Sequence, residues 1–242
     1  AQALRDNPKL ASLHLGYADG DFFMLRPLRS ETLKQLLAAP EQASYQVWSI
    51  DRSATGVEAH YLFFDDALNL ISQQQRPLEA FDPRSRSWYL SASSQAEQIT
   101  TAPYVFFSTR EVGTTLARRA GPSSVLAADL TLSDLSTTLA QHQVTASSQV
   151  ILFDAKGNTV AYPDSTRLLL MHDDQAQLTP ARDLSPELAT LLGNGLDAPH
   201  QAILELSERR WVVSRSHMQE GGPQGLHLAL LVPEDELLAD AY

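Results

Sequence analysis

The stretch Asp82-Pro83-Arg84-Ser85-Arg86-Ser87-Trp88-Tyr89 is the most informative part of this sequence, and Pro103-Tyr104 follows it. Proline fixes its own φ and biases the preceding aspartate toward extended backbone, so the stretch predicts a sharp entry into a new element. Arg86 carries a planar fork of donors that suits a carboxylate, and Trp88 and Tyr89 carry apolar faces with polar edges. From these residues alone, a ligand-binding arginine and an arginine salt-bridged over a core aromatic ring both remain open.

The composition of the chain excludes several classes of protein. Its 242 residues are 43% hydrophobic and 19% charged, which fits one large or two ordinary folded domains and argues against disorder. The net charge of −11 leaves no basic surface for phosphates, so we expect no nucleic-acid partner. The chain has no cysteine, which removes disulfides, thiolate catalysis and cysteine-based zinc sites.

Both ends of the sequence suggest a segment of something longer. No apolar run approaches the ~18 residues of a membrane-spanning helix, and the chain begins without methionine or a signal-peptide pattern. Near the other end, Pro233 and three acids predict the first turn of a helix that stops soon afterwards. We therefore expect an excised or processed piece of a larger protein.

Strand and turn signals alternate along the first half of the chain. Residues 13–17 and 22–25 flank Asp19-Gly20, which is a hairpin signature, and Ser30 precedes a short helix. Further strands are predicted at 45–50, 59–64, 67–71 and 125–130, and a short helix from Arg86 to about Ser94. Leucines at 132, 135 and 139 predict a helix capped by Thr131 or Ser133.

The second half repeats the pattern weakly. Residues 149–153 and 159–162 flank a turn at 154–158 in the manner of the first hairpin, and Ser185-Pro186-Glu187 starts a helix that ends at Gly193. Closing strands are predicted at 201–206, 211–216 and 226–232. Antiparallel strands with interspersed short helices predict an α+β fold, with a boundary between two modules at about 141–146.

The quoted motif, the later Pro-Tyr and a strand ending in Asp-x-x-Leu resemble the double-CACHE (dCACHE) family of extracytoplasmic sensors. The resemblance covers most of the chain and implies two PAS-like α+β modules in tandem, each an antiparallel sheet flanked by short helices. In this family the modules hang on a long N-terminal stalk helix between two membrane spans. Here residues 1–10 would be the end of that helix, most of which is missing, 11–143 the membrane-distal ligand-binding module and 144–242 the membrane-proximal module.

The resemblance also implies a ligand-binding site. In family members that bind amino acids, a cation with aromatic hydrogen-bonding groups holds a carboxylate, and buried aspartates hold an ammonium. Carried onto this chain, the ligand residues would be Arg86, Trp88, Tyr89, Tyr104 and Asp129. Asp129 could instead cap the following helix, and Trp88 could be a core residue; both alternatives stay open. Arg84 is expected to be a surface or structural arginine.

The chain departs from the family pattern at Phe106. An amino-acid sensor would place an aspartate there, two residues after Tyr104. Losing one ammonium-binding carboxylate could cost a few kcal/mol if the ammonium is buried. A more apolar or aromatic ligand, one with a single cationic centre, or a carboxylic acid without an amine therefore fits Phe106 and Asp129 better than an ordinary α-amino acid.

Motifs of catalysis and metal binding are scarce. The 7 histidines show no His-x-x-x-His or His-Glu-x-x-His spacing, and nucleophile-elbow, Walker and Rossmann patterns are missing. We expect no enzyme activity, no cofactor and no metal site. A hydrolase with a buried carboxylate pair remains a distant alternative.

Together, residues and resemblance predict the periplasmic sensing domain of an inner-membrane receptor that binds a small organic ligand reversibly in the distal module. The ligand would bear a carboxylate, an amine or both, and could be aromatic. Chemoreceptor, histidine kinase, cyclic-dinucleotide and nucleotide cyclase outputs are all compatible, and the stalk helix could support a homodimer. The rival hypothesis is a periplasmic protein-interaction or structural module without a small-molecule ligand.

Overall fold

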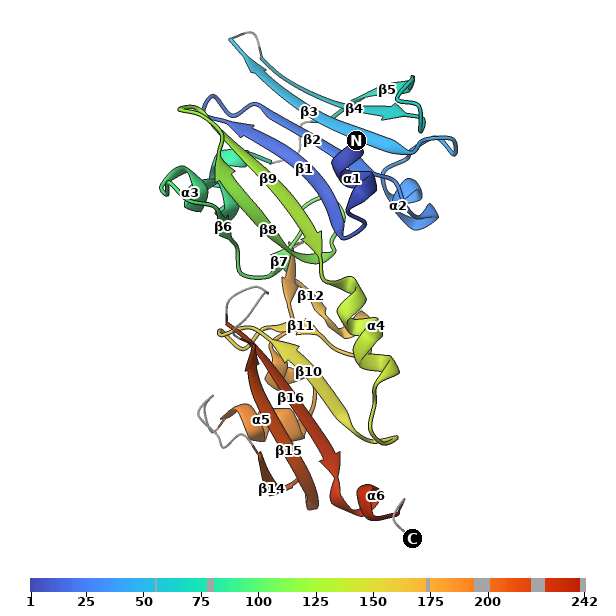
Figure 1. Cartoon of the computed structure of the whole chain (residues 1–242), viewed down its shortest axis with the longest axis vertical. Helices are drawn as coiled ribbons and strands as arrows, with labels where there is room; N and C mark the ends of the chain where they lie inside the picture. Colours follow the sequence, from blue (N-terminus) through green and yellow to red (C-terminus); the bar gives the residue numbers. More distant parts are fainter. Residues whose placement is uncertain (55, 78–80, 173–174, 194–200, 219–224, 240–242) are drawn as a thin grey trace. The chain divides into compact units, whose positions relative to one another are not determined.

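The computed structural model describes residues 1–54, 56–77, 81–172, 175–193, 201–218 and 225–239. The chain forms two compact units (Figure 1). Unit 1 comprises Ala1–Thr101 and Thr114–Thr131, and unit 2 comprises Ala102–Gly113 and Leu132–Tyr242. The predicted α+β class with antiparallel sheets and short helices is confirmed.

A large antiparallel sheet forms the framework of unit 1. Its strand order is β5-β4-β3-β2-β1-β9-β8-β6, and β7 pairs with β8 beside this path. The strands are β1 (Leu10–Tyr17), β2 (Phe22–Pro27), β3 (Tyr45–Ser53), β4 (Gly56–Phe64), β5 (Leu70–Arg76), β6 (Ile99–Thr100), β8 (Val112–Arg119) and β9 (Ser124–Thr131). Strand β7 (Tyr104–Val105) pairs with the first two residues of β8 and belongs with them to unit 2. The helices are α1 (Gln2–Asp6), α2 (Glu31–Leu36), the 3₁₀ helix η1 (Pro83–Ser85) and α3 (Ser87–Ser93).

Most predicted elements of unit 1 form, with two informative differences. The predicted first hairpin is β1–β2, and Ser30 caps α2 by accepting a hydrogen bond from the Leu33 N–H. The strand predicted at 67–71 lies later, at Leu70–Arg76, because the Asp65 carboxylate accepts from the Asn69 N–H and holds a turn. Strand β8 was not predicted. At the N-terminus, helix α1 ends at Asp6 and β1 begins at Leu10.

One face of this sheet, called the covered face, lies under η1 and α3. Because side chains alternate along each strand, every second residue points to this face. Phe81 packs its ring 4.8 Å from Phe22 and 4.7 Å from Trp48, and the Trp88 ring lies 4.6 Å from His14. The covered face is formed mainly by Ser12, His14, Gly16, Phe22, Met24, Arg26, Gln46, Trp48, Ile50, Val125, Ala127 and Asp129.

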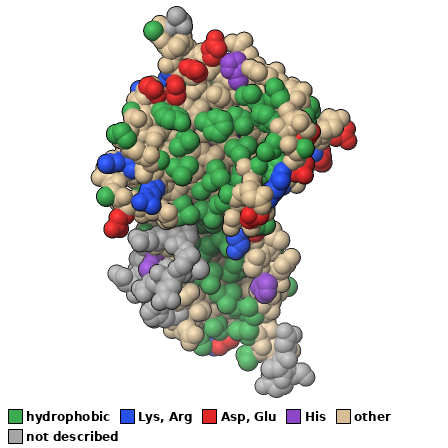
Figure 2. All heavy atoms as spheres, turned by 45° about the horizontal axis from the view of Figure 1, so that its top comes forward, with side chains coloured by type: hydrophobic (Ala, Val, Ile, Leu, Met, Phe, Trp, Pro, Cys, Tyr) green, Lys and Arg blue, Asp and Glu red, His purple; other side chains and the backbone are tan. Residues whose placement is uncertain are grey.

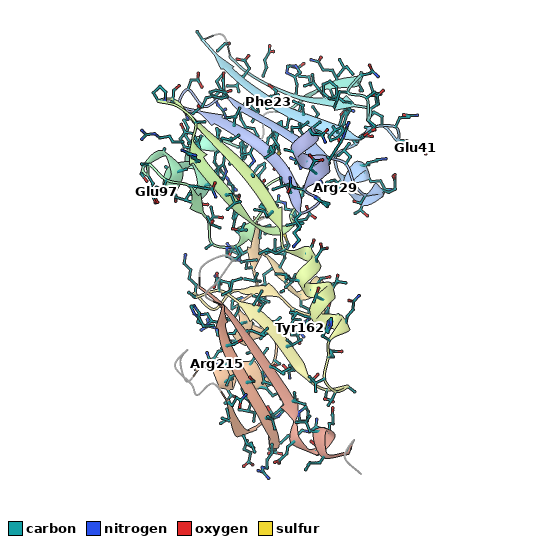
Figure 3. All side chains as sticks on the ribbon, viewed as in Figure 1. Phe23, Arg29, Glu41, Glu97, Tyr162 and Arg215 are labelled. Atoms are coloured by element: carbon teal, nitrogen blue, oxygen red, sulfur yellow. The ribbon has the colours of Figure 1, made fainter. Side chains whose placement is uncertain are left out.

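The opposite face, called the open face, is apolar and partly exposed. Phe23 on β2 (labelled in Figure 3) is 42% exposed and Leu126 on β9 is 47% exposed. Hydrophobic side chains gather over unit 1 in Figure 2. Arg29 donates to the backbone carbonyls of Leu4 and Leu10 and so fixes α1 beside β1.

Unit 2 is built on a five-stranded antiparallel sheet of order β11-β10-β16-β15-β14. Its strands are β10 (Gln149–Phe153), β11 (Thr159–Ala161), β14 (Gln201–Leu206), β15 (Arg209–Met218) and β16 (Leu226–Pro233), with β12 (Leu169–His172) and β13 (Gln175–Leu178) paired separately. The helices are α4 (Ser133–Gln141), η2 (Ser165–Arg167), η3 (Ala181–Asp183), α5 (Pro186–Gly193) and α6 (Glu234–Ala239).

Two apolar clusters hold unit 2 together. Helix α5 packs Leu188 and Leu191 against Phe153 and Trp211 of the sheet, and α4 packs Leu135 and Leu139 against a second cluster around Val160. The predicted cap of α5 is confirmed, because the Leu188 N–H donates to Ser185 Oγ. The predicted cap of α4 is wrong: its N-cap is Leu132, whose side chain makes no capping hydrogen bond.

Candidate functional site

The motif that begins at Asp82 folds as a capped turn followed by a helix. The Asp82 carboxylate accepts from the Arg84 N–H at 2.9 Å and so caps η1, with Pro83 in the first helical turn. The Arg84 guanidinium donates to the same carboxylate, with Nη2 at 2.7 Å from Oδ2. These bonds lower the pKa of Asp82, and they make Arg84 a structural arginine, as predicted.

Arg52 on β3 ties this turn to the β1–β2 hairpin. Its Nη2 donates to the Phe81 carbonyl at 2.7 Å, and its Nη1 donates to the Gly20 carbonyl. Gly20 has φ +96°, and a Cβ there would lie 2.9 Å from Arg52 Cδ and 3.0 Å from Arg84 Cζ. Only glycine combines this backbone conformation with such close approach, so the hairpin turn positions the motif.

Trp88 and Tyr89, the first aromatic residues of α3, are buried against β1. A Cβ on Gly16 would lie 2.8 Å from the Trp88 ring and 3.0 Å from the Tyr89 ring. The Trp88 ring stands edge-on to His14 at a centroid distance of 4.6 Å. Trp88 is therefore packed as tightly as a core residue, while its neighbour on the sheet is a polar side chain.

Arg86 is the N-cap residue of α3 and is half-buried. Its Cζ lies 5.7 Å from the centroid of the Phe81 ring, within the range of a cation–π interaction. It thus lies over a core aromatic ring, which is one part of the structural alternative; the salt bridge of that alternative stays untested. Its role as a ligand-binding residue stays a prediction.

Asp129 is buried in β9, opposite Ser12 of β1. Its Oδ2 accepts from Ser12 Oγ at 2.8 Å, and its Oδ1 accepts from Thr115 Oγ1 at 2.6 Å. The capping alternative is wrong, because α4 has Leu132 as its N-cap and no side-chain cap. Asp129 is instead a buried, hydrogen-bonded anion on the covered face, which suits a cationic ligand group.

His14 is the buried neighbour of this carboxylate. Its Nδ1 lies 3.4 Å from Ser12 Oγ and 3.7 Å from Asp129 Oδ2. Burial lowers the pKa of His14; Asp129 opposes this shift, and Arg26 adds to it. The imidazole is therefore neutral at pH 7. Its Nε2 is buried and has no hydrogen-bond partner among the described residues, which normally costs about 1–3 kcal/mol.

Tyr104 and Phe106 belong to unit 2, whereas the other four predicted ligand residues belong to unit 1. They lie in and just after β7, with ring centroids 5.4 Å apart, and the Phe106 N–H donates to the Glu111 carbonyl at 2.8 Å. Phe106 is buried. That these two residues join the other four in one site stays a prediction.

Among the described residues, one cavity in each unit stands out, and no predicted ligand residue lines either of the two. One of about 260 Å³ lies in unit 1 beside α1, between Leu4, Arg29 and Tyr45. The other, of about 420 Å³, lies in unit 2 between α4, Val160 and Leu168. The polar residues of the covered face are therefore the stronger candidate for a site in unit 1.

Sequence reasoning missed most of this polar face. Ser12, His14, Arg26, Gln46 and Thr115 are all buried, yet none was predicted to be part of a site. The available signal was strand alternation, which places Ser12, His14 and Gly16 on one side of β1. The predicted strand began at residue 13, so Ser12 fell outside it.

Comparisons with known proteins support these observations. No family model matches the chain. A curated relative, adenylate cyclase 1 of Rhizobium meliloti (strain 1021), is 27% identical over 248 residues. The match covers 99% of this chain but only 37% of the relative, so the chain spans little more than a third of that protein's length.

Solved structures share the architecture. The ligand-binding domain of the Pseudomonas aeruginosa PAO1 chemoreceptor PctB, in complex with L-Arg, is 17% identical with a TM-score of 0.54, covering 99% of this chain and 74% of that chain. That of the Pseudomonas fluorescens chemoreceptor CtaA, in complex with L-isoleucine, is 17% identical with a TM-score of 0.52, covering 99% and 75%. The domain of Mlp24 with asparagine is 15% identical with a TM-score of 0.55, covering 96% and 71%.

The fold is therefore one of two PAS-like α+β modules in tandem, shared with these ligand-binding domains. More specifically, it is the double-CACHE fold, as the motif around Trp88 predicted. The helices in the described part of the chain are not long and apolar enough to cross a membrane.

Proposed function

We propose that this chain is the small-molecule sensing domain of a transmembrane receptor, and that unit 1 binds the ligand reversibly. The observation that carries the proposal is the buried anion Asp129, held by two hydroxyl groups on the face that lies beneath the Trp88 helix. A buried charge set among partly unpaired polar groups is expected where a ligand completes the site.

The ligand proposed is a small organic molecule with a carboxylate, an amine or both. Arg86 and Tyr89 supply donors for a carboxylate at one edge of the motif, and Asp129 supplies the acceptor for an amine. That Tyr104 and Phe106 also contact the ligand stays a prediction from the sequence. The structural neighbours support this class, because those three domains were solved with L-isoleucine, L-Arg and asparagine.

The domain itself would perform no chemistry. Ligand binding would shift its end segments, and a membrane-anchored full-length chain would pass the shift from the periplasm to a cytoplasmic output. The relative from Rhizobium meliloti favours a nucleotide cyclase among the outputs considered. A homodimer through an N-terminal stalk helix is compatible with this scheme.

A thermal-shift screen of metabolites tests the proposal, with Arg86→Ala as the site variant and Arg118→Ala as the control. Arg118 is an exposed arginine on β8 of the same unit. We expect one chemical class to raise the melting temperature of the wild type and of Arg118→Ala, and not that of Arg86→Ala. An unchanged shift in Arg86→Ala would remove Arg86 from the site.

The open face supports the alternative of a protein-interaction module, because Phe23 and Leu126 expose apolar surface there. Under this alternative, the library would give no thermal shift. Leu126→Glu would then weaken association with a partner, whereas Arg86→Ala would leave it unchanged.

A further inference from the structure

Three rows of side chains cross the covered face of unit 1, and one of them is polar. In the first row Val125, Gly16, Phe22 and Ile50 pair across four strands, and in the second Ala127, His14, Met24 and Trp48 do the same. In the third, Asp129 pairs with Ser12, and Arg26 pairs with Gln46. Arg26 comes one residue after Leu25, the partner of Leu13, so the third row is continuous.

This polar row (Asp129, Ser12, Arg26 and Gln46) is fully inside the protein. Gln46 is 0% exposed, and neither its Oε1 nor its Nε2 has a hydrogen-bond partner among the described residues. Its neighbour across β3–β4 is Phe63, which is also 0% exposed. A buried amide with both ends unsatisfied is costly and rare, and a bound ligand is one of its ordinary explanations.

His14, in the adjacent row, presents a second open position. Because Ser12 Oγ donates its proton to Asp129, the Nδ1 of His14 can only donate toward Ser12 Oγ or Asp129. That tautomer leaves Nε2 with a free lone pair. Among the described residues, three side-chain atoms therefore lack a hydrogen-bond partner. His14 Nε2 and Gln46 Oε1 are acceptors, and Gln46 Nε2 is a donor.

We propose that His14 and Gln46 contact the ligand, which carries an amine for His14 Nε2 and a primary carboxamide for the amide of Gln46. The proposal rests on the proposed function and names the chemistry of the same site. A carboxamide matches Gln46 because each amide offers one donor and one acceptor edge to the other. Asp129, one strand from His14, adds the negative charge that attracts the amine.

The spacing of the strands fits a small ligand. His14 lies on β1 and Gln46 on β3, two strand spacings or about 10 Å apart across the sheet. Met24 and Arg26 of β2 lie in the same two rows between them, so a ligand that contacts both side chains must span this width.

Isothermal titration with L-glutamine and L-leucine tests the proposal. The site variants are Gln46→Met, which keeps the side-chain length without the amide, and His14→Phe, which keeps a ring without the lone pair. Wild type should bind L-glutamine at least tenfold more tightly than L-leucine. Gln46→Met should lower the affinity for L-glutamine at least tenfold and change the affinity for L-leucine less than threefold. His14→Phe should lower the affinity for both amino acids.

Stability of the ligand-free protein separates a binding role from a structural one. Because the Gln46 side chain makes no hydrogen bond to the described residues, Gln46→Met should raise the melting temperature by a few degrees while it weakens the binding of L-glutamine. A lower melting temperature with unchanged L-glutamine affinity would overturn the proposal, as would a wild type that prefers L-leucine.

Binding to neither amino acid would also overturn this proposal, and the metabolite screen with Arg86→Ala would then decide the proposed function separately. A structure of crystals grown with L-glutamine that shows only water between His14 and Gln46 would likewise overturn this proposal, because ordered water can satisfy buried polar groups.

Discussion

The two large sheets of this protein differ in what they bury. The covered face in unit 1 holds a carboxylate, an imidazole, a guanidinium and an unpaired amide among aromatic rings. The corresponding cluster in unit 2 joins α5 to the sheet through Ile151, Phe153, Leu188 and Trp211, all buried. Burial of apolar side chains stabilises a fold without needing hydrogen-bond partners, whereas buried polar groups lower stability unless a partner satisfies them. The contrast supports the proposal that the ligand binds to unit 1.

The largest expected effect separates two buried aspartates. Asp129 accepts from two buried hydroxyl groups, whereas Asp154 in unit 2 accepts from backbone N–H groups of the turn after β10, including that of Asn158. We expect Asp129→Ala to lower the free energy of unfolding by about 3 kcal/mol, because Ser12 and Thr115 lose their partner away from water. Asp154→Ala should cost about 1 kcal/mol, since water reaches the turn. Urea denaturation of both variants measures this, and equal losses would contradict it.

A second comparison uses two glycines. Gly16→Ala places a methyl group 2.8 Å from the Trp88 ring, whereas a Cβ at Gly193 in α5 meets nothing within 4 Å. Overpacking of this kind costs about 1–3 kcal/mol, so Gly16→Ala should lower the melting temperature by several degrees. Gly193→Ala should leave it unchanged or slightly higher. If the two variants have the same melting temperature, α3 is not packed against β1 as described.

Acid should weaken unit 1 through His14. Its folded pKa lies below the ordinary 6.5, so the unfolded chain binds the proton first, and stability falls as pH drops below 6.5. The groups that face the ring are Ser12, Asp129, Arg26 and Trp88. Urea midpoints measured from pH 7.5 to 5 should fall for the wild type and for His142→Gln, a control at an exposed histidine, and fall less for His14→Phe. A wild type without this slope would place His14 in contact with water.

The smallest expected effect concerns the end of unit 2. Arg209 donates to Asp235 at 2.7 Å and to Glu236 at 2.9 Å, and Glu236 also accepts from the Ser147 N–H at 3.0 Å. Hydrogen bonds from Ser147, Thr145 and, to a smaller extent, Arg209 lower the pKa of Glu236 from 4.5 to about 2. The contribution to stability is therefore complete above pH 4.5 and is lost as pH falls toward about 2.

Hydrogen exchange of α6 at pH 5 and at pH 2.5 measures this local effect. Exchange, corrected for its intrinsic pH dependence, should be faster at pH 2.5 in the wild type. In Glu236→Gln it should be equally fast at both values. The exposed position of these groups keeps the effect local, and a change in the global melting temperature would argue against it.

Local features of the fold were predictable from sequence, and long-range ones were not. The turn at Asp82, the helix of Trp88 and the cap at Ser185 follow from residue types that fix backbone geometry over a few positions. The pairing of Ser12 with Asp129 joins positions far apart in the chain, and no local pattern encodes it. Gln46 was missed for a different reason: an inward-facing polar residue contradicts the apolar alternation by which buried strands are recognised.

The division of the chain into units has a further consequence for how it is held together. Because residues 102–113 fold with unit 2 and are followed by strands of unit 1, the backbone passes between the units three times, after Thr101, Gly113 and Thr131. Neither unit is a single continuous fragment, so cutting the chain at any one position leaves at least one unit incomplete.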